Sequence, residues 1–328
     1  MHKGCFLLFT SVTLLMGLPN YIQGASDIKV SLPYSECYQI WDVLGDPLLS
    51  SLIRQAYQSN LDLKIARLRI TQSREQLFGA RIIEDSEDDF QETWNTVSTD
   101  VAKTYVEFKI LQQRLVVIQK SIDAKRTVLN LAQDLLNRGL NDESVLNDAK
   151  EDYHNSLAQK TQLQSSLDKA LYHMAELLDE SPSKIFVSLK EVNAFASLPI
   201  GCRPRITEEL LKERPDVRKA ERNFANACKQ VERSLAFLEF RQTFQKALEE
   251  AESASLALQE EIQRNCLLKT IQKDAYDSFQ ESELLFQRGL KDHFDLTVSM
   301  LSLLKAEDER LQGDAELLYH YIALQKAL

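Results

Sequence analysis

The sequence predicts an all-α fold built from two copies of a long coiled-coil helical hairpin. Arg138-Gly139-Leu140 recurs as Arg288-Gly289-Leu290, 150 residues later (288 − 138), and each copy lies at a break between two long helical patterns. Leu171-Tyr172-His173 likewise recurs as Leu318-Tyr319-His320. Glycine and proline, the residues that most often end helices, are few in the 328-residue chain. Self-similarity at this spacing indicates a repeated architecture, so we interpret the chain as an internal duplication.

The first repeat is predicted to span residues 48–180, after an extended lead-in over residues 26–47. Pro47 suits the start of a helix, because the first helical position needs no N–H partner and proline presets its φ. The opening helix is expected from about Leu48 to Arg81 along a broad apolar face. Gly79 fits a break soon after it.

The longest helix is expected from about Phe90 to Asn137, because its apolar residues step by three or four along one face. These positions are Val101, Tyr105, Phe108, Leu111, Leu115, Ile118 and Ile122. A helix of this length extends about 70 Å, which suits a rod rather than a compact core. Gly139 is placed to cap its C-terminus, and a return helix is expected over about Asp142 to Leu178.

Residues 181–206 are interpreted as the linker between the repeats, with a β-prone segment at Ile185-Phe186-Val187. Four residues that disfavour helices support this interpretation, namely Pro182, Pro199, Gly201 and Pro204. The second repeat, residues 207–328, is predicted to open at Thr207, whose hydroxyl can cap a helix.

The apolar seam of the second repeat restarts at Phe240 and breaks at Gly289. A last helix is expected from about Phe294 to the C-terminus.

Residues 1–25 are interpreted as a signal peptide. His2 and Lys3 precede an apolar run over residues 5–18, and the small residues of 24–26 follow it. The alternative is a membrane anchor, but a spanning helix needs roughly 20 apolar residues. Cleavage would release the chain outside the cytoplasm.

Four cysteines remain after residue 25, and none forms a Cys-x-x-Cys pair, so no metal site is expected. In an oxidising compartment a disulfide between Cys37 and Cys202 stays open as an alternative to free thiols.

Charge and motifs exclude two classes of function. The net charge of −10 argues against a nucleic-acid partner, because phosphate binding needs a basic surface. The sequence also lacks His-Glu-x-x-His, a glycine-rich phosphate loop and Gly-x-Ser-x-Gly. We therefore expect no enzymatic activity, no catalytic residue and no cofactor, and we interpret His173 and His320 as packing residues.

Two helical repeats behind a signal peptide resemble the TolC-like outer-membrane factor family of efflux and secretion channels. The resemblance covers most of the mature chain and rests on the two Arg-Gly-Leu turns and three further motifs, namely Asn60-Leu61-Asp62-Leu63, Val101-Ala102-Lys103-Thr104-Tyr105 and Glu213-Arg214-Pro215-Asp216-Val217-Arg218. It implies a homotrimer that forms a helical tunnel across the periplasm. The implied partners are a periplasmic adaptor (membrane fusion) protein and an inner-membrane transporter. The implied location is the periplasm or the periplasmic side of the outer membrane.

The resemblance also implies which residues bind the adaptor. These are the two turns, with Arg138, Gly139, Leu140, Arg288, Gly289 and Leu290. The alternative for the glycines is a helix C-cap with no further role.

The family carries aspartates at the tunnel entrance, just past the second turn. Asp295 matches the first such position, whereas Val298 replaces the second; the equivalent residues of the first repeat are Val145 and Asp148. Alternatively, Asp295 only places negative charge at a helix N-terminus, where it is favourable.

The sequence departs from the family where membrane strands would be inserted between the first and second helices of each repeat. A membrane strand needs about 9 to 11 residues. Residues 82–89 are too few and strongly acidic, and residues 232–239 contain only a short apolar patch. We therefore predict that both β-barrel insertions are missing.

Together these observations predict a periplasmic helical-tunnel component of an efflux or type I secretion-like export system. The alternative is a periplasmic coiled-coil scaffold or interaction protein without transport activity.

Overall fold

The computed structural model describes residues 41, 44–75, 80–140, 142–190 and 206–328. The predicted signal peptide and both cysteines of the suggested disulfide lie outside these residues. The described part of the chain is helical and contains no strand, which confirms the predicted all-α fold class. None of the helices described combines the length and apolar character needed to cross a membrane.

The first repeat contains two short helices followed by a long hairpin. They are α2 (Pro47–Ser59), α3 (Leu61–Glu75), α4 (Ala80–Asn137) and α5 (Glu143–Leu177). The second repeat follows the same order after a short helix, with α6 (Pro182–Leu189), α7 (Glu208–Glu213), α8 (Pro215–Asn226), α9 (Gln230–Gln287) and α10 (His293–Ala327). The hairpins match in length, since α4 and α9 each have 58 residues and α5 and α10 each have 35. The predicted duplicated hairpins are therefore confirmed.

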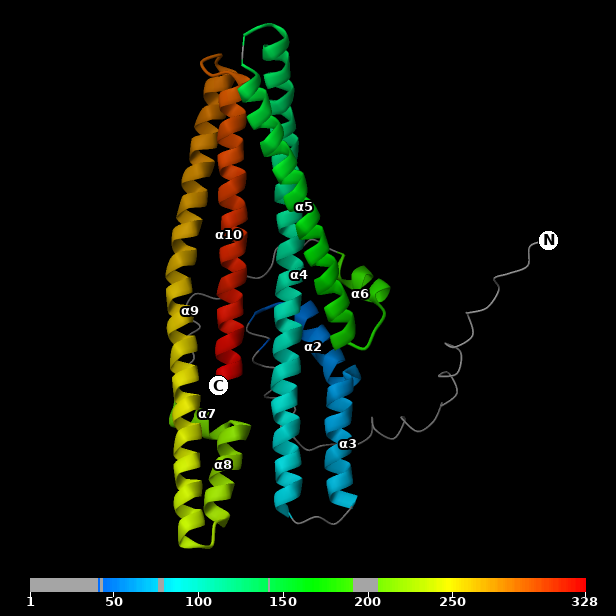
Figure 1. Cartoon of the computed structure of the whole chain (residues 1–328), viewed down its shortest axis with the longest axis vertical. Helices are drawn as coiled ribbons and strands as arrows, with labels where there is room; N and C mark the ends of the chain where they lie inside the picture. The colour runs from blue at the N-terminus through cyan, green and yellow to red at the C-terminus, as the bar shows by residue number, and fades with distance from the viewer. Residues whose placement is uncertain (1–40, 42–43, 76–79, 141, 191–205) are drawn as a thin grey trace, which may run out of the picture.

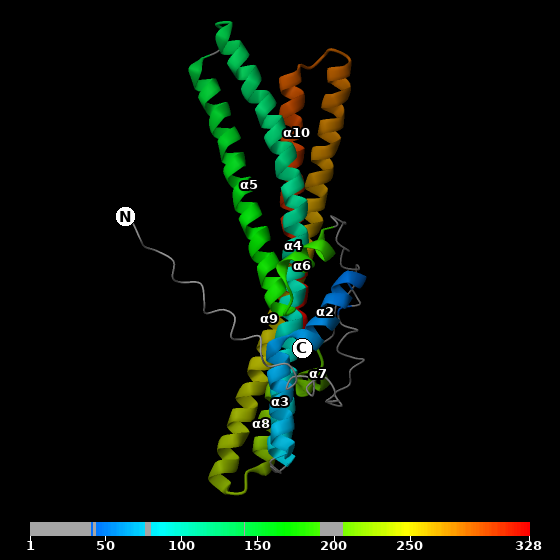
Figure 2. The same ribbon diagram turned by 90° about the vertical axis from the view of Figure 1, so that its right-hand side faces the viewer.

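The molecule is a rod in which both hairpins point the same way (Figure 1). The two hairpin turns lie at one end, called here the upper end, where the hairpins diverge (Figure 2). At the opposite, lower end α3 lies beside α4 and α8 lies beside α9. The repeats meet in the middle of the rod, where α4 packs against α10.

The main hydrophobic core lies around α4 in the middle of the rod. Val101, Tyr105 and Phe108 of α4 are fully buried in it, together with Met174 of α5 and Ile322 of α10. Burying large apolar side chains is the main force that stabilises such an assembly. Because the core includes residues of both repeats, it joins the two hairpins into one body.

The predicted opening helix over residues 48–81 is in fact two helices, with a break at Asn60. The Oδ1 atom of Asn60 accepts hydrogen bonds from the N–H groups of Asp62 (3.0 Å) and Leu63 (3.2 Å), which caps α3. Its Nδ2 atom donates to the C=O of Leu177 at 2.9 Å. The sequence pattern missed this break because the second partner is 117 residues away.

The two segments predicted to separate helices are themselves helical, so those boundaries were wrong. Residues 82–89 belong to α4, which begins at Ala80 rather than near Phe90, and residues 232–239 belong to α9. Neither segment forms a strand, in agreement with the missing insertions. Cations on α8 pair with Asp85, Asp88 and Asp89 of this acidic run.

The linker prediction also needs one correction. Pro182–Leu189, which includes the β-prone Ile185-Phe186-Val187, forms the helix α6. Pro182 occupies the first turn of this helix, a position that favours it, and buried Ile185 and Leu189 anchor α6 to the core. Tertiary packing therefore overrides the local strand preference.

Candidate functional site

The first hairpin turns at Gly139, whose φ is +68°. The N–H of Gly139 donates to the C=O of Leu136 at 2.9 Å, and the N–H of Leu140 donates to the C=O of Leu135 at 2.9 Å. This pair of bonds is a Schellman motif, which satisfies the free carbonyls at a helix C-terminus. No heavy atom lies within 4 Å of the place a Cβ would take, so the backbone conformation, not space, favours glycine.

The second hairpin turns in the same way at Gly289, where φ is +72°. Its N–H donates to the C=O of Phe286 and the N–H of Leu290 donates to the C=O of Leu285, both at 2.9 Å. The predicted glycine C-caps are therefore confirmed at both turns. The two turns present the same backbone shape at the same end of the rod (Figure 1).

Each turn exposes one leucine and one arginine. Leu140 and Leu290 are each 70% exposed, and Arg138 and Arg288 are exposed beside them. A single exposed leucine needs no explanation on a protein surface. Both turns therefore present the same exposed leucine with an arginine two residues before it.

Asp148 and Asp295 lie just beyond the turns, on the return helices. Both are exposed, Asp295 in the first turn of α10 and Asp148 on α5. The N–H of Asp295 donates to Oδ1 of the N-cap residue Asp292 at 2.8 Å, so its backbone takes part in the cap while its carboxylate is free to face solvent. The equivalent position in the other repeat holds an exposed valine in each case: Val298 corresponds to Asp148, and Val145 corresponds to Asp295.

An ion pair and a small apolar cluster fix the hairpins where they begin to diverge. Arg114 of α4 donates two hydrogen bonds to Asp308 of α10, at 2.7 and 3.0 Å. Their side chains are 18% and 20% exposed. Because the pair is largely buried and is joined by two hydrogen bonds, it contributes more to stability than an ion pair on the surface. Val117 packs beside Leu304 and Leu311 on the same seam.

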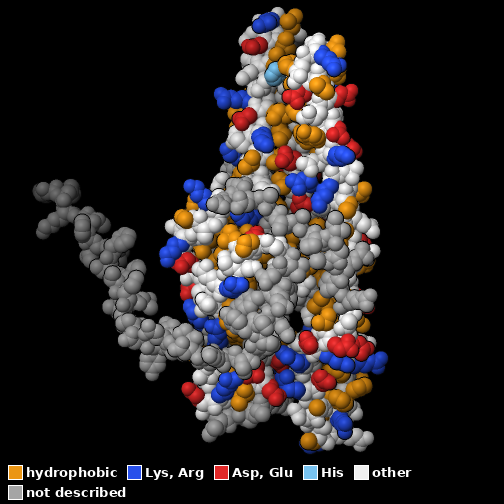
Figure 3. Space-filling model, turned by 180° about the vertical axis from the view of Figure 1, so that it is seen from behind, with side chains coloured by type: hydrophobic (Ala, Val, Ile, Leu, Met, Phe, Trp, Pro, Cys, Tyr) orange, Lys and Arg blue, Asp and Glu red, His pale blue; other side chains and the backbone are white. Residues whose placement is uncertain are grey.

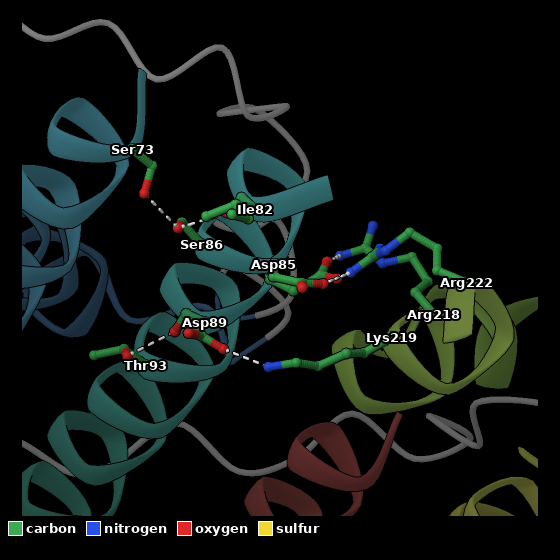
Figure 4. A network of polar contacts seen from close by, with 10 residues as sticks. Ser73, Ile82, Asp85, Ser86, Asp89, Thr93, Arg218, Lys219 and Arg222 are labelled. Atoms are coloured by element: carbon green, nitrogen blue, oxygen red, sulfur yellow. Dashed lines mark hydrogen bonds and ion pairs between the residues drawn. The ribbon is translucent and has the colours of Figure 1, made fainter. Parts of the chain in front are cut away.

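A second polar cluster joins the repeats at the lower end (Figure 4). The side chain of Asp88 in α4, 7% exposed, is paired with Arg218 at 2.7 Å and with Arg222. Arg222 also bonds Asp85 at 2.8 Å. Burial opposes the charge of Arg222, but the hydrogen bonds to Asp85 and Asp88 outweigh it and raise the pKa of the guanidinium.

One further ion pair completes the lower cluster. Lys219 donates to Asp89 at 3.0 Å, and this hydrogen bond raises the pKa of Lys219. Arg222 and Lys219 are thus charged at neutral pH.

Sequence reasoning missed the residues that fix the return helices to the short helices. In the first repeat, Asn60 donates to the C=O of Leu177 at the end of α5. In the second repeat, Arg214 donates to the C=O of Ala327 at the end of α10, at 2.8 Å. Asn60 and Arg214 each precede a short helix with nearly the same backbone, at φ −57°, ψ 133° and φ −60°, ψ 136°. Both residues belong to motifs that the sequence analysis singled out, but the motifs gave no sign of the partner at the end of the return helix.

The repeated histidines come together on one surface cleft. His173 of α5 and His320 of α10 line it from either side of α4, with Tyr319 beside them. Burial, with the charges of Glu107 and Glu316, raises the pKa of Tyr319 well above its ordinary value. No group of three or more metal-ligating side chains occurs in the residues that the structure describes.

No protein-family model and no curated protein matches this sequence. Solved structures match it over most of its length. The outer-membrane channel OprN superposes with a TM-score of 0.73 at 18% identity, covering 88% of this chain and 91% of that one. CusC, described for its transmembrane channel formation, gives 0.68 at 13% identity over 88% and 97%. The CmeC outer-membrane channel of Campylobacter jejuni gives 0.69 at 12% identity over 88% and 86%.

These identities are low, so the likeness establishes the fold. It agrees with the order of the helices, the equal hairpins and the two matching turns. The chain has the duplicated helical-hairpin fold of the outer-membrane efflux channels.

Proposed function

We propose that this protein is a periplasmic helical-tunnel component of an efflux or type I secretion-like export system. Its two hairpin turns bind a periplasmic adaptor, which connects it to an inner-membrane transporter. The observation that carries the proposal is the pair of equally exposed leucines, Leu140 and Leu290, on identical turns at one end of the rod. The fold of outer-membrane efflux channels supports it. The role needs neither catalysis nor a cofactor.

Exposed acidic residues near the turns suit the mouth of such a tunnel. Asp148 and Asp295 each add one carboxylate per chain beyond the turn. In a ring of three chains these charges would favour cations over anions at the entrance.

An apolar stripe on α9, interrupted by Gln242, Glu249, Ser253 and Glu260, supports self-association. At 100° per residue its members lie within a sector of about 60° on the helix surface. They are between 49% and 81% exposed, and they are Val231, Leu235, Leu238, Leu256, Leu267 and Ile271. Such a stripe on a helix marks the face that packs against a partner.

A second exposed apolar stripe lies on the other flank of the rod. Leu61, Ile65 and Leu68 of α3 recur at helical spacing and are about half exposed. Figure 1 places α3 and α9 on opposite flanks. Two different surfaces that meet head to tail generate a ring when the rotation closes. We therefore propose that α9 of one copy packs against the α3 flank of the next, in the trimer that the family resemblance implies.

Photo-crosslinking at the turns tests the adaptor contact. A photoreactive phenylalanine analogue replaces Leu140 or Leu290 in the source cells, and the crosslinked protein is identified by mass spectrometry. The matched control is Val187 on α6, which is 73% exposed and lies away from the turns. Crosslinks to a membrane-fusion adaptor from both turns and none from Val187 support the proposal. Equal crosslinking from all three positions would contradict it.

The same cells separate an export component from a scaffold. Leu140→Asp with Leu290→Asp places a charge in the contact, so we expect loss both of adaptor co-purification and of resistance to an exported compound. If co-purification is lost and export is unchanged, the protein is a scaffold without transport activity.

A further inference from the structure

The lower end of the rod contains two helix pairs that are packed separately. The first pair is α3 with the start of α4. The guanidinium of Arg67 lies 4.3 Å from the ring centre of Tyr57 and 5.7 Å from that of Phe90, and Arg74 bonds Glu87 at 2.7 Å. These contacts stay within the first repeat.

The second pair is α8 with the start of α9. Phe224 of α8 packs against Phe237 and Phe240 of α9, with ring centres 5.5 and 6.5 Å apart. Val217 is fully buried in an apolar cluster formed by α7, α8, α9 and the end of α10. Among the residues that the structure describes, this cluster includes none from α4.

The two pairs meet through charges. Asp88 is clamped between Arg218 and Arg222, and the pairs Arg222–Asp85 and Lys219–Asp89 flank it. Figure 4 shows the cations of α8 reaching across to α4, and Figure 3 shows acidic and basic side chains side by side near this end. Salt weakens the more exposed pairs of this cluster, Lys219–Asp89 and Arg222–Glu84, and acts less on the buried Asp88 and on the apolar seam between α4 and α10.

We propose that the ion cluster between α4 and α8 is a salt-sensitive latch that holds the lower ends of the two repeats together. High ionic strength releases the α8–α9 end from the α3–α4 end, while the seam between α4 and α10 stays closed and acts as the hinge. The latch sets the width of the lower end of the rod. It goes beyond the proposed function, because it requires neither an adaptor nor transport.

Distance measurements between spin labels test the latch in the full chain. The native cysteines are replaced by serine, and the labels are attached at Ile82→Cys on α4 and Ala225→Cys on α8, which are both exposed. The Debye length, the distance over which salt screens a charge, falls from about 10 Å at 0.1 M salt to about 3 Å at 1 M. We expect a narrow distance distribution at 0.1 M NaCl that shifts to longer distances and broadens at 1 M. An unchanged distribution at 1 M would overturn the proposal.

The control pair spans the apolar seam, with labels at Glu107→Cys on α4 and Glu316→Cys on α10, both exposed. Its distances should stay constant in salt; a shift equal to that of the first pair would indicate general loosening and overturn the latch.

Charge reversal gives an independent test at 0.1 M NaCl. We expect Arg222→Asp to lengthen the distance between positions 82 and 225, and Asp88→Arg combined with Arg222→Asp to restore part of the short distance. Circular dichroism checks that each variant folds, and the salt titration of the parent chain needs no charge variant. A double variant as open as Arg222→Asp alone would contradict a direct contact between these two side chains.

Discussion

The two hairpins turn alike but pack differently behind their turns. In the first hairpin, Ala132 and Ala149 belong to a small buried apolar cluster with Leu146. The residues at the same distances from Gly289 are Ser282 and Ser299, which hydrogen-bond to each other at 2.8 Å. Lys291 donates a further hydrogen bond to Ser282 at 2.9 Å.

This difference shows that the turn and the interior contribute separately to a hairpin. The Schellman bonds set the direction of the chain, and either alanines or bonded serines fill the space between the helices. Apolar burial stabilises the first interior, whereas a net hydrogen bond contributes only about 1 kcal/mol. We therefore expect the upper part of the second hairpin to open more readily than that of the first.

The largest expected effect comes from truncating the leucine behind each turn. Leu146→Ala removes a side chain that is 4% exposed and should destabilise the first hairpin locally by about 2–4 kcal/mol. Leu296→Ala, at the same place in the second hairpin, should cost less because Leu296 is only half-buried. Hydrogen exchange of peptides on either side of each turn measures both changes. Equal losses of local stability would contradict the difference between the two hairpin interiors.

The next effect should be the same in both hairpins. Gly139→Ala and Gly289→Ala each force an L side chain into a positive-φ conformation, which costs about 1–2 kcal/mol. No clash adds to this, because both Cβ positions are open. Local hydrogen exchange at the two turns should respond equally. A clear difference would show that the turns are not equivalent.

The smallest effect separates the hydrogen bond from the packing. Ser282→Ala leaves Ser299 and Lys291 without their shared partner and should cost about 1 kcal/mol. Adding Ser299→Ala recreates the alanine pair of the first hairpin, so the double variant should be close to the parent in local stability. A double-mutant cycle followed by hydrogen exchange measures the coupling. Additive losses would mean that the two serines do not act as a pair.

The sequence predicted the hairpins because their signals are local. Long proline-free apolar periodicities and the glycines at 139 and 289 act within a few residues, so the helices and both C-caps could be placed. Contacts between residues far apart in the sequence could not be predicted in this way. Residues 82–89 pair with cations 130 or more residues away, and Asn60 bonds Leu177, 117 residues away.

The candidate site likewise contains features that the sequence predicts and features that it does not. The exposed turns were predictable from the two repeated tripeptides, and the structure places all six of their residues at one end of the rod. The ion pair between Arg114 and Asp308 had no sequence signal, because its partners lie 194 residues apart. Whether the turns bind an adaptor stays a prediction.

The most direct test of the proposed tunnel is the mass in solution of residues 26–328, the chain without the predicted signal peptide. We predict that light scattering in detergent-free buffer gives three times the mass of one chain. Leu256→Glu with Leu267→Glu, which places charges in the α9 stripe, should give monomers that keep their helix content. A parent chain that is monomeric at all concentrations would contradict the tunnel.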